Sequence, residues 1–147
     1  MYQRILVPTD GSALSKKAIK SAVELAAGIG AEVVALNVVP RYPMSYFDGG
    51  VSVSPQEMAR IEKQWAERGQ SLAEAVEKVA ASAGVKAKAV TIRSDLVAES
   101  ILAAVRKHKC DLVVMASHGR KGIKRLLLGS ETQHVLTHGD VPVLVLR

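Results

Sequence analysis

A glycine-rich segment in the last third of the chain has the composition of a phosphate-binding loop. It contains Gly119 and, further on, the pair Gly129-Ser130. Glycine lets backbone N–H groups approach an anion closely and tolerates positive φ angles. A helix that begins at Gly129-Ser130 would add free amides and the positive end of its dipole. Arg120 and Lys121 supply positive charge. The segment therefore indicates a site for a phosphate group.

The same residues also allow a simpler explanation. A glycine-rich loop can merely turn the chain, and Ser130 can be an ordinary N-cap residue. His118, in the same loop, can pair with a phosphate or a ribose, or it can be solvated. The GxxxxGK motif of P-loop proteins is absent, and Gly28 and Gly30 follow a predicted helix, the reverse of a dinucleotide fingerprint. The residues alone leave both explanations open.

Alternating apolar runs and amphipathic segments predict the elements that position this loop. Apolar runs predict five strands, at 4–7, 32–39, 85–92, 111–115 and 141–146. Apolar residues at helical spacing predict four helices, within 12–29, 54–84, 97–105 and 130–138. Gly69 is expected to interrupt the second helix at a modest cost. Such an alternation is typical of a parallel sheet with helices on both faces. We predict a single α/β domain over 1–147, with an open five-stranded parallel sheet of Rossmann-like type.

In an open parallel sheet, ligands bind beyond the carboxyl ends of the strands, where the strand order reverses. The loop after the first predicted strand contains Thr9 and Asp10, and the loop after the fourth contains Ser117, His118 and Gly119. If these two strands are neighbours, both loops face one crevice.

Composition limits the choice of partners. The net charge of +6 favours anionic partners, although solvated lysines on helix faces also explain it. Aromatic residues make up only 3% of the chain, which argues against a surface on which nucleic-acid bases stack. Nucleic acid is therefore not an expected partner. No segment has the pattern of a signal peptide or of a membrane span. We expect a cytoplasmic protein.

Few other side chains suggest chemistry. His134 and His138 are spaced to share a metal ion on a helix, but a solvated helix face is the favoured interpretation, and no metal-ligand set is assigned. Cys110 is the only cysteine, which excludes an intrachain disulfide, and we expect it to be a small structural residue. Asp10 is the only acid in the two loops that could act as a base. No catalytic residues are assigned, and no catalysis beyond slow, incidental hydrolysis is expected.

Both ends of the chain resemble the universal stress protein family. The start at 5–12 is similar to the family's opening, and the part from 111 to 145 is similar to its closing segment. The ATP-binding branch carries G-x-x-G, nine further residues, and then glycine with serine or threonine. Here Gly119 is followed by nine residues and by Gly129-Ser130, while Ala116 replaces the first glycine. An alanine is tolerated there unless the backbone needs a positive φ or touches the ligand.

The resemblance implies a stress-response regulator that binds ATP or another adenine nucleotide, AMP or ADP. The strand ends and loops would hold the adenosine and the first phosphates, and the amides of the last predicted helix would hold the phosphate tail. The implied contact residues are Pro8, Thr9, Asp10, Val38, Met115, Ala116, Ser117, His118, Gly119, Arg120, Gly129, Ser130 and Glu131. A Mg²⁺ or Mn²⁺ ion would bind mainly through the phosphates. The family further implies a homodimer through the last strand and an unidentified downstream protein. Ala116 keeps an alternative open, a dimeric interaction module of the same family without a nucleotide.

Overall fold

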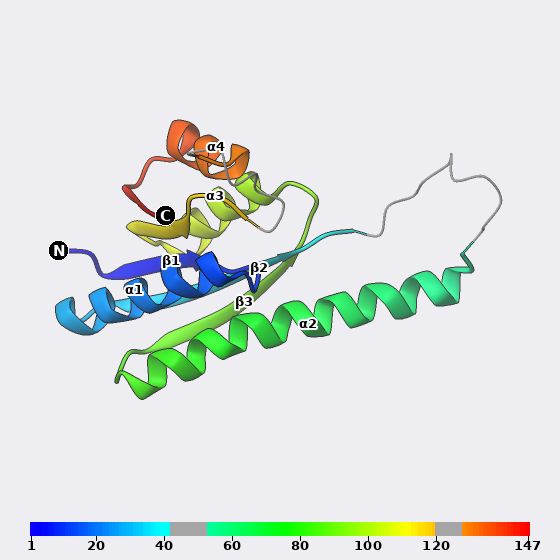
Figure 1. The fold of residues 1–147 in the computed structure, drawn as a ribbon, viewed down its shortest axis with the longest axis horizontal. Coiled ribbons are helices and arrows are strands. Elements are labelled where there is room, and N and C mark those ends of the chain that lie inside the picture. Colours follow the sequence, from blue (N-terminus) through cyan, green and yellow to red (C-terminus); the bar gives the residue numbers. More distant parts are fainter. Residues whose placement is uncertain (42–52, 120–127) are drawn as a thin grey trace.

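The computed structural model describes residues 1–41, 53–119 and 128–147 (Figure 1). Strands and helices alternate along the chain as the sequence predicts, with ends that differ by a few residues. The elements are β1 (Arg4–Pro8), α1 (Ala13–Ile29), β2 (Glu32–Val39), α2 (Pro55–Ser82), β3 (Ala87–Arg93), α3 (Val97–His108), β4 (Leu112–Ala116), α4 (Ser130–His138) and β5 (Val143–Leu146).

The strands form one parallel sheet in the order β3-β2-β1-β4-β5. From β1 the chain proceeds through β2 to β3 at one edge, and then returns past β1 to β4 and to β5 at the other edge. The order therefore reverses between β1 and β4, which are hydrogen-bonded neighbours. This confirms the condition under which the loops after the first and fourth strands face one crevice.

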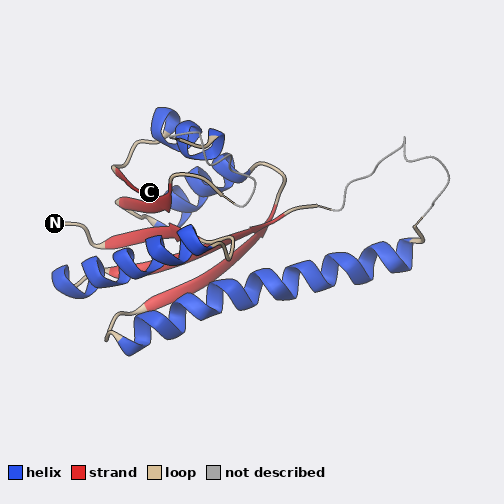
Figure 2. Ribbon diagram, viewed as in Figure 1, coloured by secondary structure: helices blue, strands red, loops and turns tan. Residues whose placement is uncertain are grey.

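Helices cover both faces of the sheet and create two apolar cores (Figure 2). α1 and α2 pack on the face that carries Ile5 and Val7, whereas α3 and α4 pack on the face that carries Leu6 and Val113. Successive residues of β1 are fully buried because side chains alternate between two covered faces. Burial of the strands on both faces thus explains the continuous apolar runs in the sequence.

Gly69 lies inside α2, and the prediction that it interrupts this helix is wrong. The helix continues through it for 28 residues, and Gly69 is buried where α2 packs on β2. A Cβ at this position would lie 2.6 Å from Val39 Cγ2 and still closer to Asn37 Oδ1. Glycine is needed here because the helix approaches the sheet closely. Within the described residues, no helix combines the length and the apolar character needed to cross a membrane.

Cys110 is buried in the core beneath α3, as expected for a structural residue. Burial raises the pKa of its thiol to about 11, which leaves roughly 0.1% of it as thiolate at pH 8. We expect no reaction of the native protein with a thiol reagent such as DTNB at pH 8, and one reactive thiol after unfolding in guanidinium. Rapid labelling of the native protein would contradict this burial.

Candidate functional site

The end of β1 is held in place by β2. The N–H of Thr9 donates to the carbonyl of Leu36 at 2.8 Å, and the Asn37 side-chain amide donates to the carbonyl of Thr9 at 2.8 Å. Thr9 and Asn37 are both buried, with 6% of each surface exposed. Asn37 was not among the site residues predicted from the sequence, although a signal was present: it is the only polar residue in the apolar run 33–39. Asn37 fixes the backbone from which Asp10 projects.

A tight turn after Thr9 fixes the carboxylate of Asp10. Its Oδ1 accepts a hydrogen bond from the N–H of Ser12 at 2.9 Å, and Ser12 caps α1 through the N–H of Ser15. Between them, Gly11 has a φ of 79°, a conformation that favours glycine. The other oxygen of Asp10 lies against the loop after β4, since a Cβ on Gly119 would lie 3.0 Å from Oδ2. The loops after β1 and β4 therefore meet at Asp10 and Gly119.

Gly129 brings the two ends of the glycine-rich loop together. Its N–H donates to the carbonyl of Ser117 at 2.6 Å. A Cβ on Gly129 would lie 3.1 Å from both Ser117 O and His118 Cα. Neither Gly119 nor Gly129 has a positive φ. The freedom of glycine to adopt a positive φ is therefore not used at these two positions. The close contacts require glycine because it has no side chain.

The first turn of α4 lacks a side-chain cap. Its N-cap residue is Gly129, which has no side chain, and no side chain in the described part of the chain caps the first amides. The interpretation of Ser130 as an ordinary N-cap is therefore wrong, because Ser130 is the first helical residue. The N-terminus of a helix with such amides attracts anions through both the N–H groups and the helix dipole. This terminus lies beside Ser117 and His118, at the carboxyl end of β4.

Glu131 and Thr132 fasten α4 to its neighbours. The Glu131 carboxylate accepts a hydrogen bond from the N–H of Ala98 at 2.8 Å, and so caps α3, which has no side-chain cap of its own. The buried Thr132 hydroxyl donates to the carbonyl of Ala116 at 2.9 Å. The Glu131 side chain thus has a role in addition to the backbone role predicted for this residue, and Thr132 was not predicted from the sequence. Together these bonds hold the uncapped helix end over β4.

The remaining sequence-predicted residues lie around this point. Pro8 ends β1, Val38 is near the carboxyl end of β2, and Met115 is buried near the end of β4. His118 Nδ1 lies 3.2 Å from the hydroxyl of Ser117. Arg120, which was also predicted for the site, and Lys121 lie outside the described residues.

Histidines and carboxylates do not assemble a metal site within the described ranges, where no group of three or more potential ligands comes together. The rings of His134 and His138 stack with centroids 4.2 Å apart, and His134 Nε2 lies 3.7 Å from Glu99 Oε1. At the crevice itself, the carboxylate of Asp10 is the one fixed anionic oxygen donor that the described part of the chain places against Gly119. A metal ion there would need most of its ligands from a bound molecule and water.

The model of the universal stress protein family matches residues 1–147. This chain belongs to that family. Universal stress protein MJ0531 of Methanocaldococcus jannaschii is 35% identical over 100% of this chain and 83% of its own length. Universal stress protein YxiE of Bacillus subtilis is 31% identical, with 100% of both chains covered.

Solved structures share the universal stress protein fold. The structure of MJ0577 has a TM-score of 0.83 at 26% identity and covers 99% of this chain and 96% of its own. Three structures of lower identity were solved with nucleotides. One holds cAMP (23% identical, TM-score 0.69, 99% and 97% covered). An Archaeoglobus fulgidus protein holds dAMP; it is 17% identical, has a TM-score of 0.65, and covers 99% of this chain and 98% of its own. An Arabidopsis thaliana protein holds AMP; it is 16% identical, has a TM-score of 0.65, and covers 97% of this chain and 90% of its own.

Ala116 replaces the first glycine of the family's nucleotide motif without backbone strain. Among the described residues other than glycine, only Lys109 has a positive φ. The Ala116 backbone pairs with Leu146 of β5, and its carbonyl accepts the Thr132 hydroxyl. Of the two conditions under which an alanine would be unfavourable in this universal stress protein, a positive φ does not apply. Contact with the ligand is the remaining one.

Proposed function

We propose that this universal stress protein binds an adenine nucleotide, with ATP as the reference ligand, and acts as a stress-response regulator. The observation that carries the proposal is the uncapped N-terminus of α4, which the Gly129–Ser117 hydrogen bond holds beside the β4 end. The contact between Asp10 and Gly119 brings the loop after β1 to the same crevice. The nucleotide-bound structures of the same fold agree with this choice of ligand.

Each part of the crevice suits a different part of the nucleotide. The amides of Ser130 and Glu131 would bind a phosphate, because they are at the positive end of a helix without a side-chain cap. The Asp10 carboxylate would accept a ribose hydroxyl, or would contact a Mg²⁺ or Mn²⁺ ion that the phosphates hold. Val38 would contact the adenine. The other proposed contacts are Pro8, Thr9, Met115, Ala116, Ser117, His118, Gly119, Arg120 and Gly129.

Replacing Ser130 with proline tests the amide contact. Proline removes the N–H of residue 130, and the first helical position tolerates it. The preceding Gly129 has φ −71° and ψ 157°, the extended conformation that a residue before proline requires. A hydrogen bond to a charged group contributes about 1.5–3 kcal/mol, so Ser130→Pro should weaken ATP binding by roughly tenfold to a hundredfold. Isothermal titration calorimetry with ATP and Mg²⁺ measures the change.

Ser130→Ala is the matched control, because it removes the hydroxyl and keeps the amide. It should bind ATP within about threefold of the unmodified protein, a difference of under 1 kcal/mol. Thermal unfolding without nucleotide should show that both variants are folded. The proposal fails if the unmodified protein shows neither heat nor a thermal shift at millimolar ATP, since a ligand of the native state must stabilise it. If Ser130→Pro and Ser130→Ala bind ATP with equal affinity, the N–H of Ser130 does not contact the nucleotide.

A second candidate function is a dimeric interaction module that acts without a nucleotide, and Ala116 is the observation that favours it. In that case the unmodified protein would not bind ATP, whereas Ala116→Gly would gain binding.

β5 is at an edge of the sheet, and 43% of the Leu144 surface is exposed. Because an unpaired edge invites association, we propose a homodimer through β5 under either function. Native mass spectrometry reports the subunit count and any retained nucleotide together.

A further inference from the structure

A second cleft lies at the opposite end of the sheet. It is formed by the amino ends of β1, β2 and β3 and by the carboxyl end of α3, and its volume is about 440 Å³. This is within the size range of pockets for small ligands. Its cationic lining residues are Arg4, Lys86, Lys88, Lys107 and Lys109. We name it the basic cleft. It is separate from the nucleotide crevice, which lies at the carboxyl ends of the same strands.

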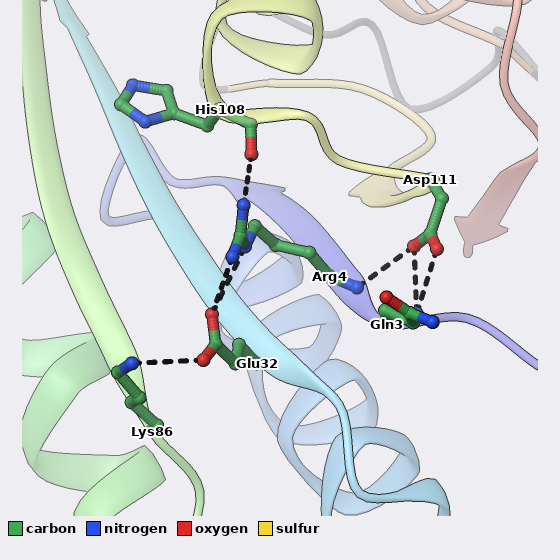
Figure 3. A network of polar contacts seen from close by, with 6 residues as sticks. All are labelled: Gln3, Arg4, Glu32, Lys86, His108 and Asp111. Carbon is green, nitrogen blue, oxygen red and sulfur yellow. Dashed lines mark hydrogen bonds and ion pairs between the residues drawn. The ribbon is translucent and has the colours of Figure 1, made fainter.

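Positive charge exceeds negative charge in the basic cleft. Among the residues that the structure describes, Glu32 is the one carboxylate that lines it. Glu32 Oε2 accepts from the Arg4 Nε and Nη2 atoms at 3.1 and 3.0 Å, and Glu32 Oε1 lies 3.1 Å from Lys86 Nζ (Figure 3). Hydrogen bonds from Lys86 and from Arg4 lower the pKa of Glu32, which therefore stays ionised at neutral pH. Two of the five cations are thus paired with the same carboxylate.

The other three cations of the basic cleft have no such partner. Within the described ranges, no carboxylate forms an ion pair with Lys88, Lys107 or Lys109. These lysines come from two separate elements, β3 and the end of α3, which converge on the concave surface. An anion inside the cleft would therefore be approached from more than one side. Such convergence differs from a row of solvated lysines along one helix face.

His108 supplies an independent indication of a ligand. Its backbone carbonyl accepts a hydrogen bond from Arg4 Nη1 at 2.7 Å, which fixes the end of α3 (Figure 3). Its ring Nε2 is buried and has no hydrogen-bond partner among the described residues. Most buried polar atoms are paired, so an unpaired one requires an explanation. A ligand in the cleft would provide it by accepting a hydrogen bond from this nitrogen, once a rotation of the ring exposes the nitrogen to the cleft.

We propose that the basic cleft binds a small polyanion with two or more phosphate-type groups. Three lysines without a carboxylate partner provide the charge, and the imidazole of His108 provides a directed donor. Apart from this imidazole, no aromatic side chain of the described residues lines the cleft, so none of them stacks on a nucleobase there. The ligand is recognised by its anionic groups and not by a base. This site is additional to the proposed nucleotide crevice and does not depend on it.

Inorganic tripolyphosphate is the probe for the first test, by calorimetry at constant ionic strength. We expect the double variant Lys88→Gln/Lys107→Gln to bind it at least about tenfold more weakly than the unmodified protein, because each lost charge contact weakens a charge-assisted bond. The control is Lys63→Gln/Lys78→Gln, which removes the same charge from exposed positions on α2. Ser130→Pro should still bind tripolyphosphate at the basic cleft, which separates this site from the nucleotide crevice.

The second readout is the imidazole signal of His108 in an NMR titration. Burial, with the charges of Lys88, Lys107 and Arg4, lowers the pKa of this group without ligand. The facing charges are Arg4 from β1, Glu32 from β2, Lys88 from β3, Lys86 before it, and Lys107 and Lys109 from α3 and its end. A bound polyanion should raise this pKa, so affinity should increase as the pH falls from 8 to 6.

Several outcomes would overturn the proposal. These are a lack of binding, equal losses in the two double variants, or an unchanged His108 titration with tripolyphosphate. A short single-stranded oligonucleotide that binds more tightly than tripolyphosphate, with an affinity that falls steeply with salt, would instead identify a nucleic-acid surface.

Discussion

Replacing Asn37 with aspartate is expected to lower the free energy of unfolding by about 3 kcal/mol at pH 8, the scale of an uncompensated buried charge. The two side chains have the same shape, but the carboxylate has no hydrogen to donate to the carbonyl of Thr9, which now receives one at 2.8 Å. A carboxylate oxygen of residue 37 would then face the carbonyl oxygen of Thr9. Water would screen this repulsion poorly, because only 6% of the surface of Asn37 is exposed.

The loss in Asn37→Asp should depend on pH with a defined sign. Burial and the Thr9 carbonyl raise the pKa of the new carboxyl above its unfolded value near 3.9. The folded state then binds more protons than the unfolded state between these two values, so stability falls as the pH rises through that window. Below it, the protonated carboxyl can donate to Thr9 and the loss should be smaller.

Urea unfolding at pH 5 and pH 8 measures both parts of the Asn37→Asp prediction. Gln64→Glu, the same change from amide to acid on the exposed surface of α2, is the control and should change stability by less than about 0.5 kcal/mol. A variant Asn37→Asp as stable as the control, at both values of pH, would contradict the proposed role of Asn37.

Gly69→Ala should destabilise the protein, although alanine is the better helix former. The new methyl would overlap Val39 Cγ2 and Asn37 Oδ1, both part of the packed interface between α2 and β2. Overpacking of this kind lowers stability by about 1–3 kcal/mol, which exceeds the gain in helix propensity of about 1 kcal/mol. Chemical denaturation followed by circular dichroism gives the difference.

Gly28→Ala is the matched control for Gly69→Ala. Gly28 is exposed in α1, and a Cβ there would have nothing within 4 Å. The same substitution should therefore raise the free energy of unfolding by about 0.5–1 kcal/mol. If both variants are stabilised, the close approach of α2 to β2 does not constrain residue 69.

The fold was predictable because its signals are local. Continuous apolar runs such as 5–7 and 112–115 arise where strands are buried on both faces, and the intervening helices show their own period. The proposed location of the nucleotide crevice rests on the general behaviour of parallel sheets and on the finding that β1 and β4 are neighbours. Gly69 was misjudged because helix propensity is local, whereas its packing against β2 is not.

The finer construction of the site was not predictable, because it rests on contacts between residues distant in sequence. Asn37 reaches Thr9 across 28 positions, and Glu131 caps α3 at Ala98 across 33 positions. No periodicity or motif encodes such pairs. Asn37 at least stands out as a polar residue within an apolar strand, but Glu131 and Thr132 look like ordinary residues in the first turn of a helix.

Because of the hydrogen bond between Gly129 and Ser117, the sequence between these two residues can change without changing the rest of the domain. Both ends of the stretch 118–128 are anchored by residues that the sheet and α4 already hold. Lengthening an anchored loop adds little entropy loss, about 0.6 kcal/mol for each doubling of its length. Under the proposed function, insertions between Ser117 and Gly129 should therefore change which nucleotide is preferred while the domain keeps most of its stability.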